Sequence, residues 1–99
     1  MRTVLVRYKV TPEHAGANES AIHAVFDALR AQHPAGFRYT SYRTEDATFV
    51  HIATVEAGKN PLFELPAFQA FQKQLEGHFV ERPVTLEIAA VDSYAGGVP

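Results

Sequence analysis

The chain has 99 residues, of which 46% are hydrophobic and 20% are charged, and these proportions are typical of one folded domain rather than a disordered chain. The formal net charge is -2 and the nine basic residues are scattered, so no basic stripe predicts nucleic acid as a partner. No cysteine is present, which excludes disulfides, thiolate metal sites and thiol nucleophiles.

No apolar run approaches the roughly 20 residues that a bilayer-spanning helix needs. The N-terminal residues alternate like a strand and do not resemble a signal peptide. We therefore expect a cytoplasmic protein with no membrane partner. A single domain is expected over residues 1–95, followed by a glycine-rich, flexible tail at 96–99.

The first strand is expected over residues 2–10, where apolar side chains recur at every second position. Thr11 and Pro12 then form a helix N-cap and first helical position, although Asn18 is a second good cap. The helix should continue to about residue 33 before Pro34 stops it. Its core-facing stripe is predicted to be Ile22, Val25, Phe26 and Leu29.

A hairpin is predicted next, with strands over residues 37–44 and 47–56 on either side of a polar turn. Residues 58–61, which include a glycine and a proline that interrupt regular structure, separate the hairpin from a short helical turn at 62–65. Pro66 is then expected to begin the second main helix. That helix is expected to bury a stripe made of Phe68, Phe71, Leu75 and Phe79. A connector at 81–83 should lead into the last strand over 84–93.

This order of elements predicts an α+β domain of the ferredoxin-like βαββαβ kind. Right-handed crossovers arrange the strands as a four-stranded antiparallel sheet in order 4-1-3-2, with the two helices on one face. The other face would then be open.

Both faces of the predicted sheet carry apolar residues, whereas a sheet with one wet face should alternate cleanly between apolar and polar. One set is Val4, Val6, Tyr8, Phe49, Val55, Leu86 and Ile88, and the other is Leu5, Tyr42, Val50, Ile52, Ala89 and Val91. We therefore expect a homodimer that forms through the sheet faces, the alternative being that these residues are simply exposed.

Three segments resemble the antibiotic biosynthesis monooxygenase-like (ABM) domain family, and the resemblance covers nearly the whole chain. They are the opening strand with the Pro12-Glu13 helix entry, the strand Phe49-Val50-His51-Ile52, and the helix start Pro66-Ala67-Phe68-Gln69-Ala70-Phe71. The resemblance implies the dimeric α/β-barrel fold.

The resemblance also implies a cofactor-independent monooxygenase that acts on a small aromatic or phenolic compound, with neither metal nor flavin. In such members the electron-rich substrate reduces oxygen itself, and the protein supplies a dry pocket and proton transfer. It implies catalytic roles for His51, on a strand, and for Asn60, at the approach to the second helix. His78 could match a histidine of the haem-degrading branch. That branch is less favoured because it holds a tryptophan and this chain has none.

From the residues themselves, an imidazole such as that of His51 can transfer protons near neutral pH. Tyr8 and Tyr39 could line a pocket for a flat ligand, and Arg43 could hold an anionic group, with His78 a further candidate contact. The alternatives are a hydrogen-bonded core or interface histidine, plain aromatic packing and a salt-bridged arginine.

The five histidines show no spacing of metal-ligand type, so no metal site is predicted. Two functional classes remain open. One is an oxygenase of the kind described above, and the other is a non-catalytic small-ligand-binding or accessory protein with the same barrel. A pocket is expected between sheet and helices, with His51 or Tyr39 at its wall and its mouth near residues 60–61.

Overall fold

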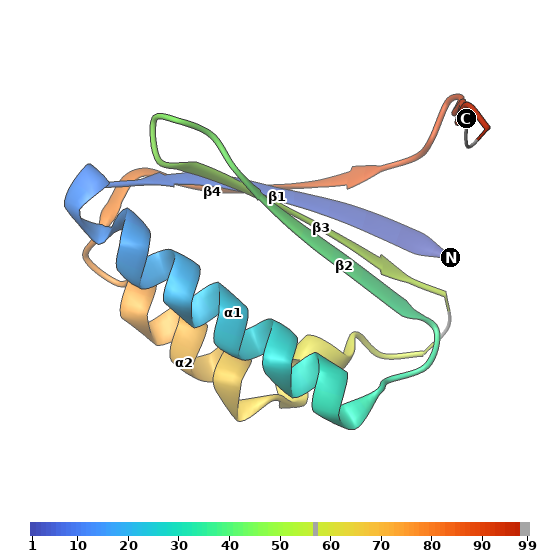
Figure 1. The fold of residues 1–99 in the computed structure, drawn as a ribbon, viewed down its shortest axis with the longest axis horizontal. Coiled ribbons are helices and arrows are strands. Elements are labelled where there is room, and N and C mark those ends of the chain that lie inside the picture. The colour runs from blue at the N-terminus through green and yellow to red at the C-terminus, as the bar shows by residue number, and fades with distance from the viewer. Residues whose placement is uncertain (57, 98–99) are drawn as a thin grey trace.

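The computed structural model describes residues 1–56 and 58–97. Its elements follow one another as β1 (Arg2–Val10), η1 (Pro12–His14), α1 (Ala15–Gln32), β2 (Phe37–Arg43), β3 (Thr48–Val55), η2 (Pro61–Glu64), α2 (Pro66–Leu75) and β4 (Phe79–Ile88). The strands form one antiparallel sheet in the order β2-β3-β1-β4, and both long helices lie on the same side of it (Figure 1). The predicted ferredoxin-like topology is confirmed.

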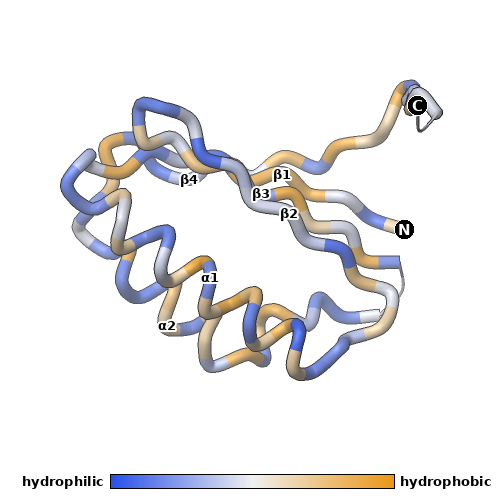
Figure 2. The backbone as a smooth tube through the Cα atoms, in the orientation of Figure 1, coloured by the Kyte–Doolittle hydropathy of each residue, from blue (hydrophilic) through white to orange (hydrophobic). Residues whose placement is uncertain are grey.

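The core lies between the helices and one face of the sheet. On β1 the side chains of Tyr8 and Val10 are almost completely buried, and on β3 Phe49 lies directly opposite Tyr8. The helices contribute their predicted stripes, which alternate with polar residues along each helix (Figure 2). The larger buried side chains from the helices are Ile22, Val25, Phe68, Phe71 and Leu75.

The first helix begins before Asn18, the second of the two residues predicted to cap it. Pro12 opens a 3-10 turn, α1 follows from Ala15, and Asn18 therefore lies within the helix with its side chain fully buried. The helix ends at His33, which adopts a left-handed conformation (φ 49°) and donates its backbone N–H to the carbonyl of Leu29.

The second helix is shorter than predicted and the last strand begins earlier. Gly77 takes a positive φ of 82°, which glycine adopts without steric cost, and the chain turns there. Phe79 is therefore the first residue of β4 and pairs with Val10, and it is not part of the α2 stripe. The predicted connector at 81–83 lies inside β4. Pro83 is tolerated because β4 is an edge strand with shifts in its pairing to β1.

The pairing of β4 with β1 determines which face of the sheet its side chains occupy. Leu86 pairs with Leu5 and Ile88 with Thr3, so Leu86 and Ile88 lie on the face away from the helices, opposite to the prediction. Ala89 and Val91 follow the end of β4, so their assignment to a sheet face was wrong.

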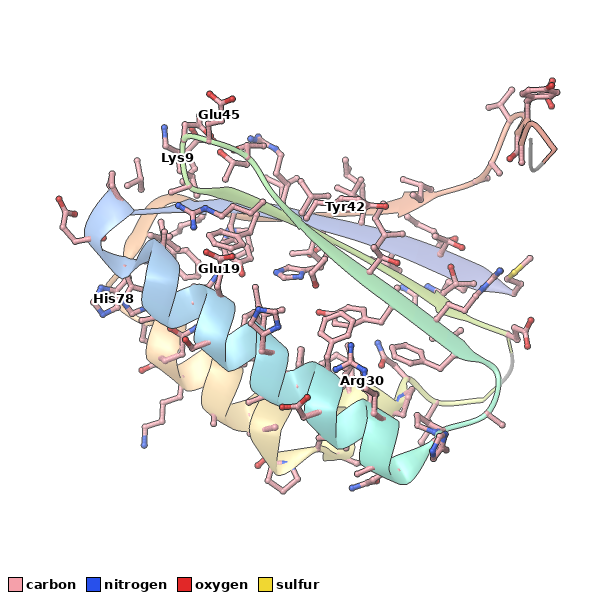
Figure 3. All side chains as sticks on the ribbon, in the orientation of Figure 1. Lys9, Glu19, Arg30, Tyr42, Glu45 and His78 are labelled. Carbon is pink, nitrogen blue, oxygen red and sulfur yellow. The ribbon has the colours of Figure 1, made fainter. Side chains whose placement is uncertain are left out.

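The sheet face away from the helices is called the open face below. It carries Leu5, Tyr42, Val50, Ile52, Val84 and Leu86. Tyr42 projects from it in Figure 3, and Tyr42, Val84 and Leu86 are 56%, 45% and 53% exposed.

After β4 the chain continues away from both helices without regular secondary structure (Figure 1). Of the predicted tail at 96–99, residues 98 and 99 lie outside the described residues. Within the described ranges, none of the helices combines the length and the apolar character required to cross a bilayer.

Candidate functional site

A cavity of about 690 Å³ lies between the sheet and α2, within the size range of small-molecule sites. Its walls are mainly apolar and aromatic, and they include Val4, Val6, Tyr39, Phe68, Phe71 and Leu75. The exposed residues Met1, Glu56 and Gly58 also line it, which places its opening near the start of β1 and the end of β3. The cavity therefore lies between the sheet and the helices, as predicted, with His51 and Tyr39 in its lining, while a mouth at residues 60–61 stays a prediction.

His51 is a polar group on the cavity wall, and it is only 4% exposed. Its Nε2 lies 2.8 Å from the hydroxyl of Tyr8, and its Nδ1 lies 2.6 Å from the hydroxyl of Ser41, its cross-strand neighbour on β2. Burial disfavours the charged imidazole and lowers its pKa to about 4. His51 is therefore neutral at pH 7 and both its ring nitrogens are bonded within the protein.

The two tyrosines at the cavity are also neutral. Burial raises the pKa of Tyr8 well above its usual value, although the hydrogen bond from Asn18 opposes this change. Burial raises the pKa of Tyr39 to about 12, against a smaller opposing effect of hydrogen bonding with Ser41. The ring of Tyr39 also stacks on that of His51, with centroids 5.9 Å apart. The wall thus offers uncharged hydrogen-bonding groups among aromatic rings.

Asn60 contributes to the cavity lining where η2 begins. Its side-chain oxygen accepts the backbone N–H of Leu62 at 2.9 Å and so caps η2. This cap explains locally why an asparagine precedes Pro61: the side chain holds the short helix whose Leu62 and Phe63 line the cavity.

Two predicted contact residues do not line the cavity. Arg43 forms an ion pair with Glu19, and its guanidinium lies over the ring of Phe49 at 5.9 Å. His78 lies at the end of the molecule where α2 leads into β4, and its ring stacks on that of His14 with centroids 3.7 Å apart (Figure 3). The structure brings together His51, Tyr8, Tyr39 and Asn60, and it leaves Arg43 and His78 apart from them.

Sequence reasoning missed Asn18 and Ser41. Asn18 donates from Nδ2 to the Tyr8 hydroxyl at 2.9 Å. A signal for it was present, because Asn18 extends the buried stripe of Ile22 and Val25 by one helical turn, and a polar residue on a buried face needs a partner. Ser41 could have been found from the alternation along the predicted strand 37–44, which places it on the same face as Tyr39.

Among residues 1–56 and 58–97, no group of three or more histidine or acidic side chains is arranged to hold a metal ion. The sequence matches no family model. No protein with curated annotation matches it either.

Solved structures do resemble it. The fold matches a proposed antibiotic biosynthesis monooxygenase from Nitrosomonas europaea with a TM-score of 0.74 and 12% identity, over 91% of this chain and 89% of that one. A proposed antibiotic biosynthesis monooxygenase from Caulobacter crescentus matches with a TM-score of 0.71 and 20% identity, over 92% and 90%. A protein from Mycobacterium tuberculosis matches with a TM-score of 0.70 and 16% identity, over 95% and 98%. This chain therefore has the ferredoxin-like fold of structures described as antibiotic biosynthesis monooxygenases, and at these identities the likeness concerns the fold.

Proposed function

We propose that the protein binds a flat, mainly apolar aromatic compound in the cavity and oxygenates it there as a phenol. The observation that carries this proposal is the cavity itself: aromatic and aliphatic walls enclose a volume suited to a small molecule, with His51, Tyr8 and Tyr39 on one side. Apolar walls favour a ring system, and a few polar groups fix its orientation.

The reaction in this proposal converts a phenol and O2 into a quinone and water. The ring carbon gains an oxygen atom, and the substrate supplies all four electrons that reduce O2, so the protein need only orient the ring, exclude water and handle protons. Both nitrogens of His51 are bonded inside the protein, so protons would pass between His51 and the ligand through a neighbouring hydroxyl. Asn60 would hold part of the cavity wall in place through its cap on η2.

Binding without turnover is the second candidate function. It is favoured by the low pKa of His51, about 4, because a group with so little affinity for a proton is a weak base toward a phenol. A non-catalytic binder would use the same cavity and the same aromatic walls.

Oxygen uptake separates the two functions. The purified protein would be treated with a metal chelator and given a panel of naphthols and polycyclic phenols without added flavin, while an oxygen electrode and absorbance record turnover. Under the enzyme proposal His51→Ala slows turnover by about 10²–10⁴-fold, the usual range for general acid–base groups. The matched control His23→Ala, an exposed histidine on α1, should leave the rate unchanged. Saturable binding without oxygen uptake would instead establish the binder, and neither binding nor uptake would overturn both.

We also propose that two copies associate through the open face. Four strands about 4.8 Å apart and about eight residues long present a surface of roughly 500 Å². A stable interface needs about 800 Å² from each partner. The segment after β4 can supply the remainder, since Val91 and Tyr94 are 100% and 92% exposed there.

A further inference from the structure

A second pocket lies beside the cavity, between the C-terminal half of α1 and β2. Its volume is about 290 Å³, and Phe26, Leu29, Arg30 and Phe37 line it together with Tyr39. Arg30, which is exposed and labelled in Figure 3, shows its place on α1. Among residues 1–56 and 58–97, Tyr39 is the one residue that lines both the cavity and the second pocket.

The ring of Tyr39 stands between aromatic rings that belong to the two spaces. On the side of the second pocket it stacks on Phe26 and Phe37, with centroids 5.2 and 5.8 Å away and ring planes 21° and 24° apart. On the side of the cavity it stacks on His51, with centroids 5.9 Å apart and planes at 14°. His51 is held in turn by hydrogen bonds at both ring nitrogens. The Tyr39 ring therefore has packed neighbours on both sides and fills the space between cavity and pocket.

The place of Tyr39 in the sheet explains why its ring separates these spaces. It lies on β2, which is an edge strand, and on the face that the helices cover. Its cross-strand neighbour on β3 is Ala53, whose small side chain leaves room beside the ring. No residue of α1 lines the cavity, whereas α1 supplies Phe26 and Leu29 to the second pocket. The ring thus closes the cavity on the side of α1.

We propose that Tyr39 is a specificity-determining residue whose ring ends the cavity toward β2 and α1, so that the site takes compact aromatic ligands and excludes those with a long chain at that end. This inference rests on the proposed function in one respect, namely that the cavity takes a flat aromatic ligand. Without the ring, the cavity would continue into the second pocket, where the apolar side chains of Phe26, Leu29 and Phe37 favour a hydrocarbon chain.

A series of 2-naphthols with linear alkyl chains of two, four, six and eight carbons at C6 tests the limit, with binding followed by naphthol fluorescence. In the wild type the affinity should rise with chain length until the chain meets Tyr39 and should then stay constant. In Tyr39→Ala it should continue to rise, so that the longest compound binds about tenfold more tightly than to the wild type, the effect of about two further buried methylenes. The control Tyr39→Phe keeps the ring and should keep the wild-type limit.

A second measurement locates the chain. Leu29 lines the second pocket and not the cavity, so the end of the octyl chain should give nuclear Overhauser effects to the Leu29 methyl groups in Tyr39→Ala and none in the wild type. The double variant Tyr39→Ala/Leu29→Trp fills the second pocket and should cancel the gain in affinity. A gain that survives Leu29→Trp would overturn the inference, because the chain would then lie elsewhere.

The outcomes separate this inference from the proposed function. The same chain-length limit in the wild type and in Tyr39→Ala overturns the inference alone, whereas failure of every naphthol to bind the wild type overturns the proposed function. Overhauser effects between the octyl chain and Leu29 in the wild type overturn the inference without any variant. If Tyr39→Ala does not fold, Tyr39→Val makes the same test, since a β-branched side chain suits a strand and also lacks the ring.

Discussion

Tyr8 and His51 come from neighbouring strands and lie two register positions apart, yet their side chains share a hydrogen bond of 2.8 Å and their rings stack with centroids 5.4 Å apart. The pair is sealed by Phe79 against Tyr8 and by Phe71 against His51, each ring meeting its neighbour edge-on. This packing keeps a titratable imidazole in an apolar environment, and its consequences for stability can be measured.

The first prediction concerns the pH dependence of stability. The pKa of His51 is about 4 in the folded protein and about 6.5 in an unfolded chain, so the unfolded state binds more protons between these values. The free energy of unfolding should therefore fall as the pH is lowered from 6.5 to 4, by about 3 kcal/mol from this group. Urea denaturation of wild type and His51→Gln at several pH values isolates the effect, and parallel pH profiles would contradict it.

The second prediction concerns the aromatic face of α2. Phe71 is 5% exposed and packs on Phe68 and His51, so Phe71→Ala should reduce the free energy of unfolding by about 3–5 kcal/mol. Gln72→Ala, at the exposed neighbouring position, should change it by less than about 0.5 kcal/mol. Equal denaturation midpoints for the two variants would show that Phe71 is not packed as described.

The third prediction tests the open face. Light scattering at micromolar concentration should give about twice the 10.9 kDa chain mass for the wild type. Leu86→Lys places a charge beside Leu5 on that face, and it should shift the protein toward the monomer mass. Gln72→Lys, at an exposed position of α2 away from the sheet strands, is the matched control. A monomeric wild type would rule out association through this face.

The fourth prediction compares two glycines at which an added Cβ meets no atom within 4 Å. Gly77 has φ +82°, so Gly77→Ala should destabilise the protein by about 1 kcal/mol through backbone strain alone. Gly16 lies in α1 with an ordinary helical backbone, so Gly16→Ala should stabilise it by about 0.5–1 kcal/mol. Thermal unfolding should shift in opposite directions, and shifts of the same sign would show that the turn after α2 is not held as described.

Local pattern in the sequence was enough to predict the order of the elements, the strand order and the helix faces that point at the sheet. The spacing of apolar side chains depends on the geometry of one strand or one helix. The alternation along residues 2–10 and the stripe from Ile22 to Leu29 can therefore be recognised without knowing which elements pack against them. The position of the cavity followed from the same reasoning, because two helices on one face leave space only beneath them.

Only the tertiary structure decided the register of β4 and the hydrogen-bond partners of the site residues. Gly77 ends α2 early, and the pairing of Leu86 with Leu5 places Leu86 on the open face, an outcome that depends on two segments about 80 residues apart. Asn18 meets Tyr8 and Ser41 meets His51 across successive elements, and Tyr8 and His51, 43 residues apart, meet only because β1 pairs with β3. Periodicity shows which face of an element is buried, but a hydrogen bond needs two atoms within about 3 Å, and that precision comes from packing the elements together.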